Sequence, residues 1–454
     1  MAAMGRRVDF RSGSVIQNYI RFVIPIILSS VLHLFFNTAD MIVVGKFVSD
    51  SAQAAVSSTG ALITSMVCLA TGLSSGINVL MARYVGADDH ETASCVVHTA
   101  LTTALGLGSG LAVLCLLTAP FFLKLMEFPP EIMEQAIIYL RIYFFGLPLQ
   151  LFFEFGAATM RGQGDSRRPM LCLTTGGVVN VLTNLLFVLG FGCGVEGVAI
   201  ATVLSYAVSA ALVFWCMRHD SGPGHFDYKS MGINWPMLGK IARIGIPAGI
   251  QGMTFSLSSV LVQSSMNSLG AIAVTGAGAA GNLTQYANMV GNSASAACVT
   301  FAAQNMGANQ PQRLRKGYRQ MSLLVMGVDV VVSLLILGLA PLALWMFTND
   351  PAVVQEALIH IRVMLPFHWI HGYMQCTQGT QRGLGASIGP MVVTILGTCV
   401  LRVCWATAIF PLRPTHAFLV FGYPVTWMVT TIAQRIHLGG LFNKVFAGAE
   451  AKQA

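Results

Sequence analysis

Long apolar runs recur along the whole chain and are separated by short polar or Gly/Pro-rich breaks. Each run has about 20 residues or more, the length that an α-helix needs to cross the hydrocarbon core of a bilayer. A membrane β-barrel would instead show alternating segments of roughly 10 residues. The pattern predicts an all-α membrane protein with twelve transmembrane helices, at residues 19–45, 51–82, 93–123, 132–160, 169–190, 194–217, 238–266, 272–303, 320–347, 352–380, 388–410 and 414–434.

The composition agrees with this prediction, because 55% of the residues are hydrophobic and only 10% are charged. A soluble globule of this size would need more polar surface. The first span is too long for the apolar part of a cleavable signal peptide, so we expect it to remain in the mature protein. The ten cysteines have no CxxC spacing, and neither a disulfide framework nor a metal-cysteine site is expected.

The distribution of basic residues predicts the orientation, since Lys and Arg next to spans are retained in the cytoplasm. Most of the 26 fall on the side of the N-terminus, and Arg402 lies within a span. Both termini are therefore expected in the cytoplasm, and the formal charge of +8 reflects this asymmetry and indicates no nucleic-acid surface. The residues on the opposite side are Lys46, Lys124, Arg141, Arg362 and Arg413.

The chain also repeats itself. At a shift of 221 residues, helix breakers and charges coincide in the pairs Gly86 and Gly307, Pro130 and Pro351, Arg141 and Arg362, Arg161 and Arg382, Gly162 and Gly383, and Pro169 and Pro390. This duplication predicts an N-terminal six-helix lobe (1–217), a cytoplasmic linker (218–240) and a C-terminal six-helix lobe (241–454). Pro25 and Pro247 occupy equivalent spans and are expected to act as hinges. Two such lobes around a cleft are typical of alternating-access carriers.

Several segments resemble the multidrug and toxic compound extrusion (MATE) transporters of bacteria. They are IPIILSSVLHLFFNTADMIVVGKF, MARYVGADD and AATMRGQGDSRRPM, with the weaker echoes IPAGIQ, AAQNMGANQ and TQRGLGASIGPM in the second half. The resemblance covers essentially the whole chain. It implies a multi-pass plasma-membrane antiporter, not an enzyme, that needs no cofactor and exports cationic or amphipathic organic compounds against an inward flow of protons or sodium ions. We expect it to act as a monomer among membrane lipids.

Asp40 is the most informative single residue. An ionised carboxylate deep in a bilayer costs about 2.5 to 3.5 kcal/mol, so it should face water or polar partners. The predicted topology brings Asn180, Asn184 and Thr202 to a similar depth. A carboxylate, two amides and a hydroxyl offer the oxygen ligands that a small cation prefers, and the carboxylate alone could carry a proton. A structural carboxylate held by neighbouring hydrogen bonds, with the other three residues joining helices, is the alternative.

The resemblance sharpens this hypothesis. In one branch of the family, residues matching Asp40, Asn180 and Thr202 form a cation site in the N-terminal lobe, together with an aspartate at the position of Asn184. The loss of that second carboxylate leaves a proton switch at least as favoured as a sodium site at Asp40. Other branches place acidic residues on the seventh and tenth spans, where this chain has glutamines such as Gln251, so we expect coupling in the N-terminal lobe.

Further side chains are weaker candidates for substrate contacts. The apolar ones also suit ordinary packing, and Glu154 either pairs with Arg161 on one helix face or attracts the substrate. Asp329 has no counterpart in the first half and is expected to have a partner that the sequence does not identify. The substrate candidates are Phe35, Phe36, Met41, Glu154, Met253, Phe255 and Arg402.

Other function classes fit less well. No GxxxxGK[ST] motif indicates an ATP-driven pump, and no HExxH motif or matched acid pair indicates an intramembrane enzyme. A flippase for lipid-linked oligosaccharides, from the wider superfamily, is the main alternative, although its anionic cargo calls for more deep basic residues than Arg402. A channel or passive scaffold is the alternative of another class, and it would have no need of Asp40 for a response to pH or sodium.

Overall fold

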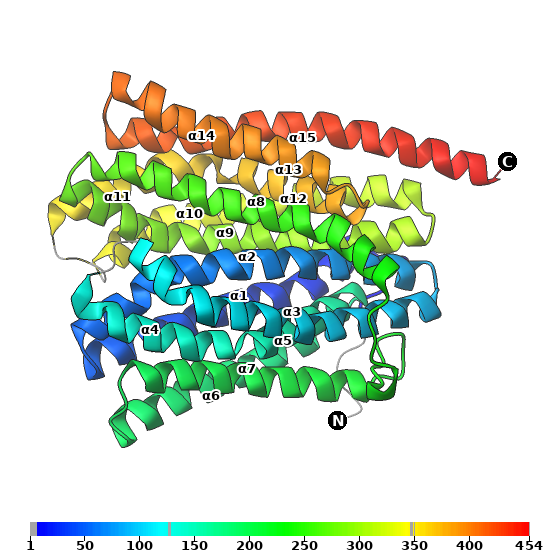
Figure 1. Ribbon diagram of the computed structural model, residues 1–454. Coiled ribbons are helices and arrows are strands. Elements are labelled where there is room, and N and C mark those ends of the chain that lie inside the picture. Colours follow the sequence, from blue (N-terminus) through cyan, green and yellow to red (C-terminus); the bar gives the residue numbers. More distant parts are fainter. Residues whose placement is uncertain (1–6, 126–128, 346–347, 349, 454) are drawn as a thin grey trace. The chain divides into compact units, whose positions relative to one another are not determined.

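The computed structural model describes residues 7–125, 129–345, 348 and 350–453, and every regular element in these ranges is a helix (Figure 1). The helices of the first half are α1 (Val15–Phe47), α2 (Asp50–Gly86), α3 (His90–Leu125), α4 (Pro130–Phe145), α5 (Leu147–Gly162), α6 (Arg167–Leu185) with the π-helical turn η1 (Leu186–Gly190), and α7 (Val195–Arg218).

The short turn η2 (Tyr228–Ser230) precedes the second half. This half contains α8 (Trp235–Asn267), α9 (Ala271–Gly307), α10 (Pro311–Leu344), α11 (Pro351–Met364), η3 (Leu365–Phe367), α12 (His368–Gly383) and α15 (His416–Gln453). Between α12 and α15, one continuous helical segment changes type repeatedly, as α13 (Ile388–Thr394), η4 (Ile395–Val400), α14 (Leu401–Cys404), η5 (Trp405–Ile409) and η6 (Phe410–Leu412).

Each of the twelve predicted spans corresponds to one helical segment. Two segments are broken: α4 and α5 meet at 47°, and η3 interrupts α11 and α12. Residues 346 and 347, the end of the predicted ninth span, lie outside the described residues. Among the described helices, eight are long and apolar enough to cross a membrane, or nine with the bent pair. The helices α2 and α9 are not among these eight. Each has 37 residues, but both are rich in Ala, Gly and Ser.

The local structure repeats with the sequence. Asp88 and Asn309, just after α2 and α9, both have a left-handed backbone with φ of 55° and 53°. Gly164 and Gly385, after α5 and α12, both have φ of 86°. Each pair is separated by the same 221 residues that align the breakers, so the turns that end the helices are duplicated together with the helices.

The chain forms two compact units. Unit 1 contains Met1–Val8 and Ile24–Gly245, and unit 2 contains Asp9–Val23 and Ile246–Ala454. Both boundaries fall inside helices, immediately before Pro25 of α1 and Pro247 of α8. A proline inside a helix removes one backbone hydrogen bond and kinks the helix, so α1 and α8 are weakened where the chain passes between units.

The connector after α7 belongs to unit 1 by its contacts. The backbone N–H of Asp227 donates to His98 Nε2 at 3.1 Å, and that of Asn234 donates to Thr99 Oγ1 at 3.3 Å. Both acceptors lie on α3, which therefore holds the connector in place.

The RGQGDSRRP segment builds the turn between α5 and α6. The Asp165 carboxylate accepts hydrogen bonds from the backbone N–H groups of Arg167 and Arg168, at 3.1 and 3.0 Å, and pairs with the Arg168 side chain. Asp220 forms ion pairs with Arg168, at 3.4 Å, and with Arg7. The most distinctive motif in the sequence therefore has a structural role, because it ties the start of α6 to the end of α7.

Gly164 in this turn should be very sensitive to substitution. A Cβ atom at residue 164 would lie 2.0 Å from the carbonyl oxygen of Val8, in addition to the cost of a left-handed backbone, which is about 1–2 kcal/mol for a non-glycine residue. Gly192 is a matched control, since its φ is 66° but a Cβ atom there would meet nothing within 4 Å. We expect Gly164→Ala to lower the thermal unfolding temperature in detergent clearly more than Gly192→Ala, and equal effects would contradict the collision.

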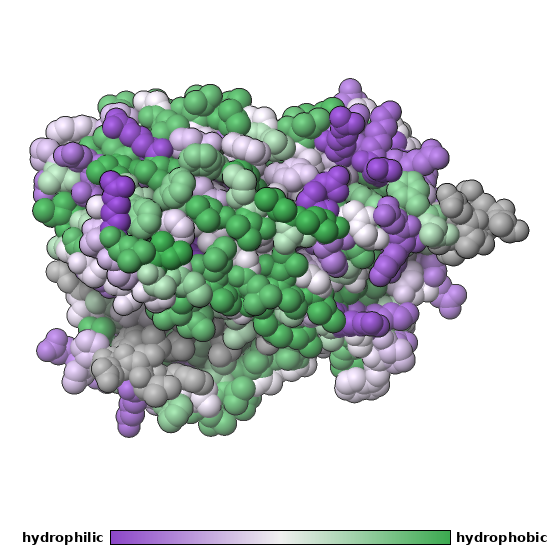
Figure 2. Space-filling view, turned by 90° about the horizontal axis from the view of Figure 1, so that it is seen from above, coloured by the Kyte–Doolittle hydropathy of each residue, from purple (hydrophilic) through white to green (hydrophobic). Residues whose placement is uncertain are grey.

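Figure 2 shows where apolar side chains gather on one face of the molecule. They form a broad region over the middle of the helices, whereas hydrophilic side chains lie mainly toward the helix ends. Exposed residues such as Leu117, Leu182 and Leu342 are typical of a surface that faces lipid. This face is therefore typical of a membrane protein, with apolar side chains along the middle of the spans and hydrophilic ones toward their ends.

Candidate functional site

In unit 1, side chains of α1 and α6 meet around Asp40. The Phe36 ring packs directly on the backbone of Gly177, where a Cβ atom would lie 1.9 Å from the ring. Asp40 follows Phe36 by one turn, and Asn180 and Asn184 follow Gly177 by one and two turns. Because residues three or four apart share a helix face, this register aligns the carboxylate with both amides.

Both asparagines hydrogen-bond to Asp40. Asn184 donates from Nδ2 to Asp40 Oδ1. With its nitrogen turned toward the carboxylate, the Asn180 amide donates to Oδ1 at 2.7 Å and to Oδ2 at 3.2 Å. Asn180 and Asn184 are buried, and Asp40 is half-buried. The structure therefore brings together three of the four residues that were predicted from the sequence.

The backbone of the sixth helix changes type directly after this site. The α6 helix ends at Leu185 and continues as the π-helical turn η1, in which the Phe191 N–H donates to the Leu186 carbonyl at 3.1 Å. Isolated π-helical turns are rare and frequently occur at functional sites. The wider turn leaves Asn184 at the junction of two helix types.

Thr202 is not joined to this group. Its hydroxyl donates to the Val198 carbonyl of its own helix, α7, at 3.0 Å. In the part of the chain that the structure describes, it makes no hydrogen bond to Asp40. The Thr202 hydroxyl therefore hydrogen-bonds within its own helix, and its oxygen lone pairs can still accept from a further partner.

Sequence reasoning missed a group of tyrosines around the same site. Tyr139 of α4 is buried and lies near enough to Asp40 for the two side chains to interact electrostatically. Its ring stacks on that of Tyr143, with the ring centroids 6.2 Å apart. The Tyr143 hydroxyl donates to Gln150 Oε1 at 3.4 Å, and its ring meets Tyr206 of α7 at 6.3 Å. The i, i+4 spacing of Tyr139 and Tyr143 in an apolar span is the signal that could have indicated them.

The acidic residue Glu154 lies half-buried on α5, one turn after Gln150. The ion pair with Arg161 that its spacing suggested is not formed, since no described residue lies within ion-pair distance of Glu154. Within unit 1, Phe35 is 64% exposed, and Met41 lies 4.0 Å from the Ser57 hydroxyl. Phe35 is thus exposed and Glu154 forms no ion pair among the described residues, whereas Phe36 is held against Gly177.

In unit 2, Arg402 is packed rather than free. It is 2% exposed and lies over the ring of Tyr423 at 4.2 Å and over that of Phe255 at 5.4 Å. Its Nη2 donates to Thr426 Oγ1 at 3.3 Å. No carboxylate among the described residues forms an ion pair with it, so aromatic faces stabilise this cation. Phe255 and Met253, the other candidates here, are each 42% exposed.

Asp329 has a partner in unit 2. Its Oδ1 lies 3.6 Å from Nδ1 of His368 on α12, and both side chains are fully buried. The partner that the sequence did not identify for Asp329 is therefore His368, in the tenth predicted span.

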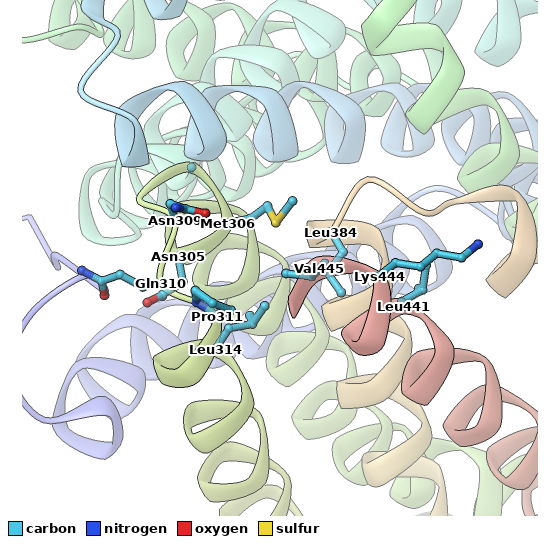
Figure 3. A pocket seen from close by; sticks show the side chains of 11 residues that line it. Asn305, Met306, Asn309, Gln310, Pro311, Leu314, Leu384, Leu441, Lys444 and Val445 are labelled. Atoms are coloured by element: carbon cyan, nitrogen blue, oxygen red, sulfur yellow. The ribbon is translucent and has the colours of Figure 1, made fainter. Parts of the chain in front are cut away.

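The described part of unit 2 contains a pocket of about 350 Å³ between the α9–α10 turn, the end of α12 and α15 (Figure 3). Its lining includes Asn305, Gln310, Leu384 and Lys444. None of the residues predicted for substrate or cation binding contributes to it. Elsewhere among the described residues, no cluster of three or more His, Cys, Asp or Glu side chains could hold a metal ion.

Comparison with known proteins gives consistent results. The family model MatE matches residues 25–186 and 247–407, one copy in each half of the chain. The probable multidrug resistance protein YoeA of Bacillus subtilis is 28% identical over 427 residues, which are 92% of each chain. The FAD transporter of Shewanella oneidensis is 26% identical over 353 residues, 75% of this chain and 76% of that protein.

The fold is also similar to that of solved structures. The crystal structure of MATE in complex with MaL6 superposes with a TM-score of 0.90 over 96% of this chain and 99% of that chain, at 23% sequence identity. This likeness confirms the predicted fold class of twelve transmembrane helices in two six-helix lobes.

Proposed function

Because this chain belongs to the MatE family of multidrug transporters, we propose that it exports cationic or amphipathic organic compounds in exchange for an inward flow of cations. Members of this family are transporters that need no cofactor, which agrees with the absence of an enzyme motif in the sequence. Membership confirms the resemblance seen in the sequence. The coupling ion and the chemical class of the cargo are the parts that we propose.

Asp40 is proposed as the residue that couples the cation to the cargo. The observation that supports this assignment is the convergence of two buried amides on a carboxylate within a membrane-spanning helix. A carboxylate solvated by amide N–H groups can stay ionised, and it loses these charge-assisted bonds when a cation neutralises it. Cation binding would therefore weaken the hydrogen bonds between α1 and α6, and this change favours a different packing of the two helices.

The orientation of the amides supports a proton rather than a sodium ion. Both Asn180 and Asn184 present nitrogen to Asp40, and the Asn184 Oδ1 atom is buried without a hydrogen-bond partner in the described structure. A sodium ion needs several oxygen ligands, so both amides would have to turn, and Thr202 would have to add its hydroxyl. A proton needs only the carboxylate.

The proposed cycle follows from these contacts. Asp40 takes up a proton from the outside, the α1–α6 contact rearranges, and the cargo leaves; release of the proton on the inside restores the amide bonds and the cargo-binding state. The ligand shifts the balance between two conformations only by as much as its affinity for them differs. The exposed residues Phe35, Met253 and Phe255, with the half-buried Met41 and Glu154, are proposed to contact the cargo.

The rest of the arrangement is proposed on the same basis. The two six-helix repeats, 1–217 and 241–454, would act as the lobes of an alternating-access carrier, with 218–240 as their linker and Pro25 and Pro247 as hinges. We place the protein as a monomer in the bacterial plasma membrane, with both termini in the cytoplasm, because the basic residues are concentrated on that side.

The test is export of a cationic dye by purified protein in liposomes, with a proton gradient and a sodium gradient imposed separately. We expect the proton gradient to drive export and the sodium gradient to have no effect at constant pH. Dye movement that needs neither gradient would refute the antiporter and favour a channel.

The buried position of Arg402 leads to a prediction about the charge of the cargo. If the cargo is cationic or amphipathic, replacing this packed cation by a side chain of similar length should change dye export by no more than about threefold, a difference below 1 kcal/mol. We therefore expect Arg402→Met to retain export of a cationic dye in liposomes. Loss of lipid-linked oligosaccharide transport in this variant, together with no dye export by the parent protein, would instead support a flippase.

A further inference from the structure

Unit 2 contains an acid and two histidines that the proposed coupling at Asp40 does not use. Asp329 lies in the middle of α10, and His368 and His371 lie on the first turn of α12. The Asp329 and His368 side chains are both 0% exposed. Neither carboxylate oxygen has a hydrogen-bond partner among the described residues, and the same is true of Nδ1 in both histidines. Four buried polar atoms without partners at one place are unusual.

The hydrogen bonds of His368 indicate where a proton must be. Its Nε2 lies 3.2 Å from Asn288 Oδ1 of α9, an atom that only accepts; with the Asn288 amide in this orientation, Nε2 carries the hydrogen. Nδ1 of a neutral ring then has a lone pair, and this lone pair faces the Asp329 carboxylate at 3.6 Å. Two acceptors repel each other unless one proton lies between them. The pair is stable when either the carboxyl group or the imidazole holds that proton.

The backbone around the pair is shaped to fit it. A Cβ atom at Gly372 would lie 1.8 Å from Asp329 Oδ2, so the carboxyl group packs directly against α12 where no side chain is present. The rings of His368 and His371 lie 5.0 Å apart, and both pack on Trp427 of α15. The carboxyl group and the imidazole are therefore held close together by three helices.

A row of polar residues connects this pair to the exposed surface of unit 2. The His371 ring and the Gln375 side chain lie side by side over Gly291 of α9, at 3.2 and 3.5 Å from the position of a Cβ atom. Gln375 in turn donates to Asn292 Oδ1 at 2.6 Å, and this amide pair is exposed. His371, only 8% exposed, lies between these amides and His368. An imidazole can accept a proton at one nitrogen and release it at the other, as in proton relays.

We propose that Asp329 and His368 form a proton-binding site in unit 2, reached from the surface through His371. The site takes up one proton from His371. Within the pair, the proton breaks its bond to Asp329 Oδ1 as it bonds to His368 Nδ1, and it returns to His371 when the site loses it. The other ionisable groups near the pair are His371 on α12, Tyr19 on α1 and Arg402 on α14, while α9 and α15 contribute Asn288 and Trp427. This site does not depend on the coupling proposed for Asp40.

Infrared difference spectroscopy between about pH 5 and about pH 9, the range in which histidine sites titrate, tests the proposal. The protein carries Asp40→Asn, so that residue 40 contributes no carboxyl band, and is reconstituted in lipid. We expect a protonated-carboxyl band that titrates and is lost on adding Asp329→Asn. Adding His368→Gln should shift its midpoint to higher pH by at least about one unit, because the carboxylate loses the imidazole that can carry a positive charge beside it. Asp227→Asn, in the connector after α7, should leave the band unchanged.

The site would be refuted if the titrating band survived Asp329→Asn or if its midpoint were the same with His368→Gln. Should Asp329→Asn not yield monodisperse protein, the shift in the His368→Gln protein decides by itself. Since the experiment measures proton binding without any cargo, it separates failure of this site from failure of drug export at Asp40.

Discussion

Asp40→Asn is expected to abolish export driven by a proton gradient, down to the level of liposomes without protein. The substitution keeps the size of the side chain and its ability to accept from Asn180 and Asn184, so the fold should be retained. It removes the only group at this site that can bind and release a proton, and it fixes residue 40 in a neutral state. Binding of a cationic dye, measured by fluorescence, should be weaker than in the wild-type protein, because the proposed cycle releases the cargo from the neutral state.

Two comparisons make this result interpretable. Asp227→Asn removes a partly exposed carboxylate from the connector after α7 and should export the dye at the wild-type rate. If Asp40→Asn exported the dye at the wild-type rate with the same ion dependence, Asp40 would be a structural carboxylate held by two asparagines.

Asn184→Asp is expected to produce the second largest effect, a new dependence on sodium. A second carboxylate beside Asp40 adds a negative charge and replaces the present N–H donor of residue 184 by a second oxygen ligand. Hard oxygen ligands and negative charge favour a small cation. Export at constant pH should then be stimulated by sodium at least about tenfold, a difference of about 1.4 kcal/mol, whereas the wild-type protein should not respond to sodium.

Asn37→Asp is a suitable control for this experiment. Asn37 lies on α1 one turn before Asp40, is exposed, and contacts His33 at 3.3 Å rather than Asp40. A carboxylate there adds the same charge as Asn184→Asp, but on α1 beside His33 instead of on α6 opposite Asp40. Equal sodium stimulation in both variants would show that the effect comes from net charge, which would contradict a cation site at residues 40 and 184.

The helices and their duplication could be predicted from the sequence because each is encoded locally. Apolar runs of sufficient length define the spans, and the Gly and Pro residues that recur at a shift of 221 residues lie where helices begin and end. Even the left-handed residues after α2 and α9 follow this repeat. The breaks at Gly146 and at η3 were not predicted, since an apolar run does not show where a helix bends.

The candidate site could be predicted only in part. The i, i+4 spacing of Asn180 and Asn184 placed them on one face of their helix. The depth of Asp40 in the first span predicted that this carboxylate lies opposite that face. The sequence did not show which amide atom faces the carboxylate, nor that Thr202 bonds to Val198, because these depend on side-chain rotamers. The pairing of Asp329 with His368 was also hidden, since it joins residues 39 positions apart on helices whose contact only the tertiary packing determines.

Counterflow of protons and cargo tests the central claim most directly. Liposomes containing the purified protein and an internal pH-sensitive dye are prepared without any imposed gradient, and a cationic substrate gradient is then applied in sodium-free buffer. Proton antiport through Asp40 predicts a substrate-dependent change in internal pH in the wild-type protein and none in Asp40→Asn. A substrate flux of normal size without proton movement in the wild-type protein, or equal proton movement in both proteins, would contradict it.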